Sequence, residues 1–194
     1  EASARRLNVL KRVAEAREKL SHMKLGCFGE PGGLIASDVD FDKLKALSGM
    51  ECRMFDLEEV VGEFHKGGYP ENAYTKELKT KGFDPQEVDK ALQVYGALKR
   101  LIARYDLTGV TVKCFDLLGR IHTTGCLALA LLNAEGIPAA CEGDQKSLVS
   151  MAVLEALTGQ AGFMANPSCM DPEKSEIIFA HCTLPINMPD SYHL

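Results

Sequence analysis

The stretch AACEGDQKSLVSMAVLEALTG, residues 139–159, decides the fold. Its apolar start predicts a buried strand over Pro138–Glu142, and its almost wholly apolar second half predicts a helix over Ser147–Leu157. Asp144 is placed to cap that helix, and Gly159 is placed to end it, because glycine readily takes the left-handed conformation. The stretch is therefore a strand, a turn with two carboxylates and a helix that packs against a sheet.

The same alternation of strand and helix recurs through residues 1–160. Further strands are predicted at Cys52–Phe55 and Val110–Phe115, and Asp84-Pro85-Gln86-Glu87 is a strong helix start. Strands that alternate with helices of this length imply right-handed β-α-β crossovers and a parallel sheet. We therefore expect an α/β fold: a doubly wound, mainly parallel open sheet with flanking helices, of the Rossmann-like kind.

The pattern changes after Gly159. The segments GFMAN and EIIFAHC read as two strands joined by a turn-rich stretch with no helix between them. Residues 161–194 are expected to be a β-strand extension, the start of a further β-rich domain. We also expect the chain to be a piece of a longer protein.

The composition indicates a globular protein and excludes several classes. Hydrophobic residues make up 46% of the chain and charged residues 25%, with a formal net charge of −5, which argues against nucleic-acid binding. Apolar runs are too short for a membrane span. Seven cysteines without a CxxC pair argue against a zinc ribbon and favour a reducing, cytoplasmic location. GCFGEPGG is not a GxGxxG fingerprint, so no dinucleotide cofactor is expected.

Four residues are candidates for a metal site with catalytic function. Glu142 follows a strand end and is not needed as a helix cap; it is either an exposed loop residue or a partly desolvated general base. His181 is predicted on a strand, on the same face as Ile177 and Phe179, as a core histidine or a ligand. Asn166 and Asp171 are near enough in a hairpin to meet it. Carboxylate or amide oxygens with an imidazole suit manganese or magnesium.

A thiol enzyme is another function that the sequence leaves open. It would use Cys141 or Cys182, both of which are predicted inside apolar strands. Strand alternation predicts that Cys182 points away from the side of His181, which argues against a Cys–His pair between these neighbours.

Three ordered segments resemble a known family. NAEGIPAACEGDQKSLVSMAVLEALTG, AGFMANPSCMDPEK and IIFAHCTLP together are similar to the L-fucose isomerase and L-arabinose isomerase superfamily, in particular to its fucose-isomerase-like members. The earlier segment KLGCFGEPGGLIAS resembles the start of that family's middle domain. On this resemblance residues 1–160 correspond to the middle domain, and residues 161–194 begin a β-rich C-terminal domain.

The resemblance implies a metal-dependent aldose–ketose isomerase that uses Mn²⁺, or another divalent metal such as Mg²⁺. Glu142 would be a metal ligand and acid/base, and His181 a metal ligand. The family's further acidic residue is replaced by Ala165, followed by Asn166; Asn166 would bind metal through its oxygen, and Asp171 would supply the second acid/base. The family completes its site between subunits, which implies a homo-oligomer. The alternative is a non-catalytic sugar-binding or regulatory module on the same scaffold.

Overall fold

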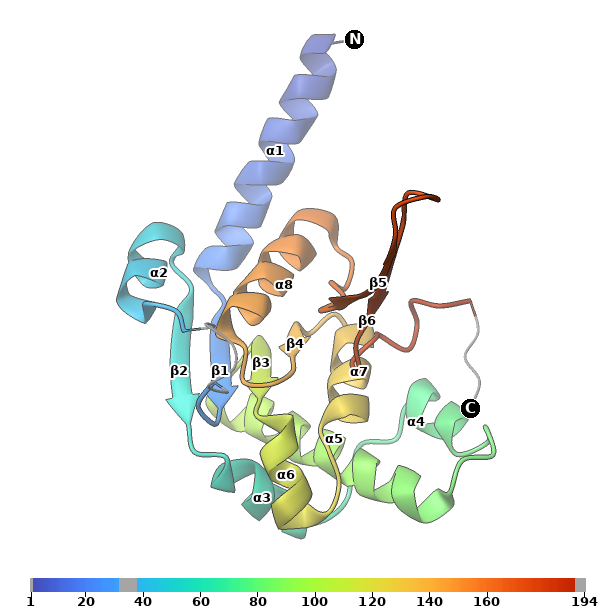
Figure 1. The fold of residues 1–194 in the computed structure, drawn as a ribbon. Coiled ribbons are helices and arrows are strands. Elements are labelled where there is room, and N and C mark those ends of the chain that lie inside the picture. The colour runs from blue at the N-terminus through green and yellow to red at the C-terminus, as the bar shows by residue number, and fades with distance from the viewer. Residues whose placement is uncertain (1, 32–37, 191–194) are drawn as a thin grey trace.

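The computed structural model describes residues 2–31 and 38–190 (Figure 1). Its helices are α1 (Ala2–Ser21), α2 (Phe41–Ser48), α3 (Glu58–His65), α4 (Ala73–Leu78), α5 (Pro85–Tyr105), α6 (Cys114–Ile121), α7 (Cys126–Ala134) and α8 (Gln145–Thr158). Its strands are β1 (Lys24–Phe28), β2 (Glu51–Phe55), β3 (Gly109–Val112), β4 (Ala139–Ala140), β5 (Asn166–Asp171) and β6 (Glu176–Ala180).

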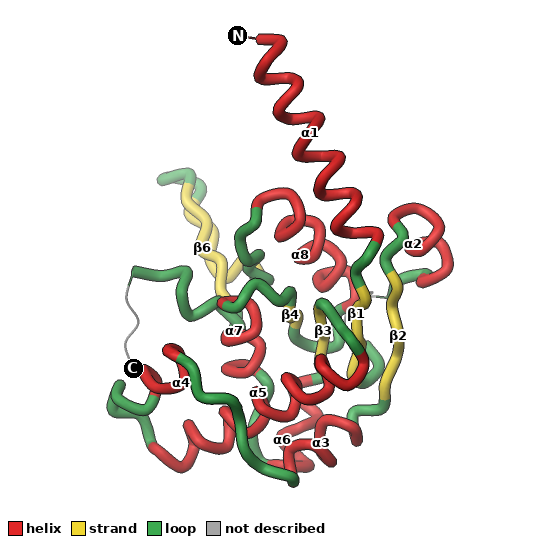
Figure 2. Tube along the Cα trace, turned by 180° about the vertical axis from the view of Figure 1, so that it is seen from behind, coloured by secondary structure: helices red, strands yellow, loops and turns green. Residues whose placement is uncertain are grey.

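The first four strands form one parallel sheet in the order β2-β1-β3-β4. Helices cover both faces, as Figures 1 and 2 show. Alternate side chains of β1 divide between two cores: Leu25 and Cys27 pack with α8, whereas Phe28 packs with α3, α5 and α7. The predicted doubly wound α/β sheet is confirmed. The strand order reverses between β1 and β3, and ligands of such sheets bind beyond the carboxyl ends of the strands near such a point.

The predicted helix caps are also present. Asp84 accepts hydrogen bonds from the amides of Gln86 and Glu87, and Asp144 accepts one from the amide of Ser147 at 2.9 Å. Gly159 ends α8 in the left-handed conformation, with φ of 68°.

One predicted strand is too long. The expected strand Val110–Phe115 ends at Val112, and α6 begins at Cys114. Cys114, Leu117 and Ile121 recur at helical spacing and are buried, whereas Phe115 is 64% exposed. The short apolar run concealed this change of period, since a strand and a buried helix share the same composition.

The C-terminal hairpin is a separate two-stranded antiparallel sheet. Every residue of β6 is exposed, and the hairpin extends away from the parallel sheet (Figure 1). The change of architecture after α8 is therefore present, while the division into domains at residue 160 stays a prediction. No helix in the described part of the chain is both long and apolar enough to cross a membrane.

Candidate functional site

The site begins at a tight turn that follows β4. Glu142 and Gly143 both have positive φ, 63° and 68°, and the amide of Asp144 donates to the carbonyl of Cys141 at 3.0 Å. Two left-handed central residues closed by such a bond make a type I′ turn. This turn favours glycine, asparagine or aspartate, so a glutamate at its first central position is unusual.

The conformation of Glu142 therefore carries a steric cost. An L-residue in the left-handed region loses roughly 1–2 kcal/mol relative to the right-handed one. Such strain is often found at functional sites, where the side chain is needed in a position that the backbone does not favour. Gly143 explains the rest of the turn: a Cβ there would lie 3.2 Å from the carbonyl oxygen of Glu30, so the turn packs directly against the loop after β1.

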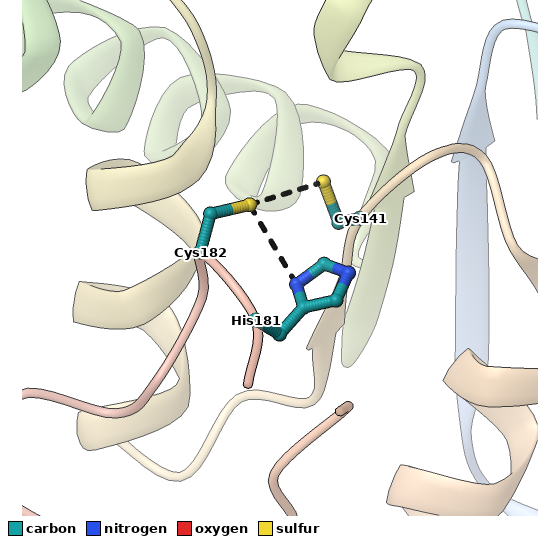
Figure 3. Close-up of side chains that lie close together, drawn as sticks. All are labelled: Cys141, His181 and Cys182. Atoms are coloured by element: carbon teal, nitrogen blue, oxygen red, sulfur yellow. Dashed lines mark hydrogen bonds between the residues drawn. The ribbon is translucent and has the colours of Figure 1, made fainter. Parts of the chain in front are cut away.

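His181 lies across from this turn. Strand β6 ends at Ala180, and the chain then returns toward β4 (Figure 3). The imidazole is only 5% exposed, and its Nε2 lies 3.8 Å from Oε1 of Glu142, whose side chain is 23% exposed. The expectation that His181 shares a strand face with Ile177 and Phe179 is wrong, because those side chains are about half exposed and His181 lies beyond the end of the strand.

The gap between Glu142 and His181 suits a shared ion better than a direct hydrogen bond. Strong N–H···O bonds are about 2.7–3.2 Å long. Two ligands that are each about 2.1 Å from one small divalent cation can be as much as about 4.2 Å apart. The 3.8 Å separation lies between these limits. A carboxylate oxygen and an imidazole nitrogen are also donors that manganese accepts.

The other two predicted site residues are placed differently. Asn166 pairs with Ala180 at the base of the hairpin, one residue from His181, and its side chain is exposed. Asp171 pairs with Glu176 near the tip of the hairpin. From there to His181 is five residues along a strand, or about 17 Å. The structure therefore does not bring Asp171 to Glu142 within one copy of the chain.

Asp171 has a clear structural role where it lies. Its carboxylate accepts bonds from the amides of Glu173 and Lys174, both at 3.1 Å, and pairs with the Lys174 ammonium at 3.2 Å. These bonds, first of all the one from the Lys174 amide, hold the pKa of Asp171 below its usual value. The side chain stabilises the hairpin turn as a carboxylate.

Asp56, which follows β2, and Asp116, in the first turn of α6, serve the local structure. Asp56 accepts a bond from the amide of Glu58 at 3.0 Å in the first turn of α3, and Asp116 pairs with Lys113 at 3.3 Å. They border a hollow of about 510 Å³ together with Glu30 and Arg120. Arg120 itself is paired with Glu58.

The sequence analysis named Cys141 and Cys182 as candidate thiols but missed that they lie together beside His181. Sγ of Cys141 is 3.2 Å from Sγ of Cys114 and 3.9 Å from Sγ of Cys182, and Cys182 is 3.6 Å from Nδ1 of His181 (Figure 3). The prediction that Cys182 points away from His181 is wrong, because strand alternation no longer applies after Ala180. The cysteines come from segments far apart in the sequence, so no spacing could have revealed them.

The thiols differ in their acidity. Cys126, at the start of α7, lies beside Cys141 and Cys182 and accepts a hydrogen bond from the hydroxyl of Thr124 at 3.1 Å. These contacts lower the pKa of Cys126. Hydrogen bonding to Cys114 raises the pKa of Cys141, and hydrogen bonding to Cys126 raises that of Cys182.

The known proteins that are similar to this chain share the name sulfoquinovose isomerase. The chain is 25% identical over 187 residues to sulfoquinovose isomerase of Alkalicoccus urumqiensis, covering 91% of this chain and 42% of that protein. It is 27% identical over 188 residues to the sulfoquinovose isomerases of Priestia aryabhattai and Priestia megaterium, covering 92% of this chain and 41% of each. No family model matches the chain. The chain thus spans about two fifths of these relatives and is similar to them over most of its own length.

Proposed function

We propose that this chain is part of a metal-dependent sugar isomerase, in which Glu142 and His181 hold the divalent cation. The observation that carries the proposal is the 3.8 Å approach of the Glu142 carboxylate to the nearly buried His181 ring. The left-handed conformation of Glu142 supports it, because the chain keeps a carboxylate at a place where the backbone favours glycine. The relatives named sulfoquinovose isomerase support the isomerase class and make sulfoquinovose the first substrate to test.

The proposed reaction moves a proton between the first two carbons of an aldose. Glu142 removes the proton from C2 as a general base and returns it to C1 as a general acid, which converts the aldose into the ketose. His181 has little freedom to turn, since it is buried between Glu142 and the thiols. A divalent cation, when bound, lowers the energy of the negative charge that develops on the sugar oxygens.

A second acid/base group is required at the sugar's hydroxyl oxygens, and Asp171 is the proposed residue. Within one copy it lies at the far end of the hairpin, so we propose that the hairpin of a second copy brings it to the site. The exposed apolar side chains of β6, Ile177, Ile178 and Phe179, are consistent with a hairpin that is covered in an assembly. The proposal therefore includes a homo-oligomer of the full-length protein, in the cytoplasm.

Manganese binding tests the site. Titration of the chain with Mn²⁺, followed by loss of the free-ion electron paramagnetic resonance signal, is expected to show about one bound ion per chain. Glu142→Gln should weaken binding at least tenfold, and Glu15→Gln, exposed on α1, should leave it unchanged. A chain that binds no manganese, or binds it equally well after Glu142→Gln, would contradict the assignment. Ketose formation from sulfoquinovose by the full-length protein then tests the reaction.

A non-catalytic sugar-binding module is the second candidate. One observation favours it: among the described residues, Glu142 is the carboxylate that reaches His181, and Asp171 does not join it. A module of this kind would keep its affinity for sugar in the presence of a chelator. The proposed isomerase would lose both sugar affinity and turnover, and calorimetric titration with and without chelator separates the two.

A further inference from the structure

We propose that Cys141, Cys182 and Nδ1 of His181 form a second cation site, selective for a thiophilic divalent ion such as Zn²⁺. The site is distinct from the proposed Glu142–His181 site in its ligands, although the two share one imidazole ring. Two thiol sulfurs and one imidazole nitrogen converge there from the turn after β4 and from the segment after β6 (Figure 3). Such a donor set favours zinc over manganese, because thiolate is a soft ligand.

Two of the three distances between the donors match those of a tetrahedral site. Zinc lies about 2.3 Å from thiolate sulfur and about 2.0–2.1 Å from imidazole nitrogen, so tetrahedral geometry places two sulfurs about 3.8 Å apart and sulfur about 3.6 Å from nitrogen. The two sulfurs of Cys141 and Cys182 are 3.9 Å apart, and Cys182 is 3.6 Å from Nδ1 of His181. The donor atoms of all three residues lie within 4.8 Å of one another. Binding thus needs only small movements.

The orientation of His181 supports the assignment. Its Nδ1 faces the sulfurs and also the hydroxyl of Thr183 at 3.2 Å, while Nε2 faces Glu142. A carboxylate beside Nε2 favours the tautomer that carries its proton there, which leaves the lone pair of Nδ1 for an ion. A histidine that binds a metal through one nitrogen while the other faces a carboxylate is a common arrangement in zinc sites.

The two sites compete for this ring. A neutral imidazole offers one lone pair, so His181 binds a soft ion through Nδ1 or a hard ion through Nε2, but not both. Occupancy by zinc is therefore expected to weaken manganese binding at Glu142. Cys182 as a residue is exposed, which gives an ion access from solvent. With three protein ligands, water takes the fourth position of the zinc.

Cobalt substitution tests the site directly. The reduced chain, with all seven cysteines confirmed as free thiols, is titrated with Co²⁺ under anaerobic conditions. We expect a thiolate-to-cobalt charge-transfer band in the near ultraviolet and the visible bands of tetrahedral cobalt, which added Zn²⁺ abolishes. Cys182→Ser should lose the charge-transfer band, whereas Cys169→Ser, on the exposed hairpin strand β5, should keep it.

Two results would overturn the proposal. The first is the absence of a thiolate-to-cobalt band in the wild-type chain while circular dichroism shows it to be folded. The second is a band that Cys182→Ser leaves at full intensity. Glu142→Gln separates this proposal from the first site, because it should retain the cobalt–thiolate band while it weakens manganese binding.

Discussion

Replacing Glu142 by glycine and by alanine separates the strain of its backbone from the chemistry of its side chain. Both variants lack the carboxylate that faces His181, and they differ only by one methyl group. In Glu142→Gly the turn should relax, since glycine takes a φ of 63° without a steric penalty. Glu142→Ala keeps the penalty.

The expected difference follows from two opposing effects. A Cβ in the left-handed region costs roughly 1–2 kcal/mol. Glycine, in turn, gives the unfolded chain more conformational freedom than alanine does, which lowers the free energy of unfolding by about 0.4–1 kcal/mol. The balance makes Glu142→Gly more stable than Glu142→Ala by about 1 kcal/mol, the reverse of the order at ordinary positions.

Urea denaturation followed by circular dichroism measures this difference. With a slope of about 2 kcal/mol per molar urea, 1 kcal/mol moves the midpoint by about 0.5 M. Both variants should also lose manganese binding, so that Glu142→Gly leaves a stable protein without a site. Equal midpoints, or a more stable alanine variant, would show that the turn is not strained and would remove one support for a functional Glu142.

Three further predictions concern the rest of the fold. Gly96→Ala should destabilise the protein by about 2–4 kcal/mol in the same urea assay, because a Cβ would lie 2.8 Å or less from the backbone of the loop after α3. Its control, Gly62→Ala, has open space around the added Cβ and should stabilise the protein by about 0.5–1 kcal/mol. Glu63 is buried, and hydrogen bonds from Lys66 first, then from two arginines, lower its pKa to about 2 from 4.5. Glu63→Gln should lower the free energy of unfolding by about 2–3 kcal/mol at neutral pH. The wild-type protein should lose this extra stability as the pH falls from about 4.5 to about 2, because Glu63 then becomes protonated. A stability difference between the two proteins that does not change over this range would contradict the ion pairs. Burial raises the pKa of Cys27 to about 12, so iodoacetamide at neutral pH should modify exposed Cys169 well before buried Cys27, as peptide mass spectrometry would show. Labelling of Cys27 as fast as that of Cys169 would argue against its burial.

The fold could be predicted largely because its signals are local. Alternating strands and helices, the caps Asp84 and Asp144 and the final Gly159 are each determined by a few neighbouring residues. The start of α6 was missed because the local signal there is ambiguous. Cys114 and Phe115 continue the apolar run of β3, and only the burial of Leu117 and Ile121 reveals the change from strand to helical period.

The site was predictable only in part. The sequence indicated Glu142 because a strand end followed by a glycine-containing turn exposes a side chain at the edge of the sheet. It could not place His181, Cys182 or Asp171, because their positions depend on where β6 ends and how the chain then turns. Strand alternation was extended over two residues beyond the end of β6, so His181 and Cys182 were expected on opposite sides although their side chains lie together.

A crystal grown with Mn²⁺ tests whether Glu142 and His181 share one cation. Anomalous scattering at the manganese edge locates the ion without reference to any assumed mechanism. We expect one peak about 2.1–2.2 Å from both the Glu142 carboxylate and Nε2 of His181. No peak there under saturating manganese, or a peak bound to other residues while these two side chains keep their present positions, would contradict it.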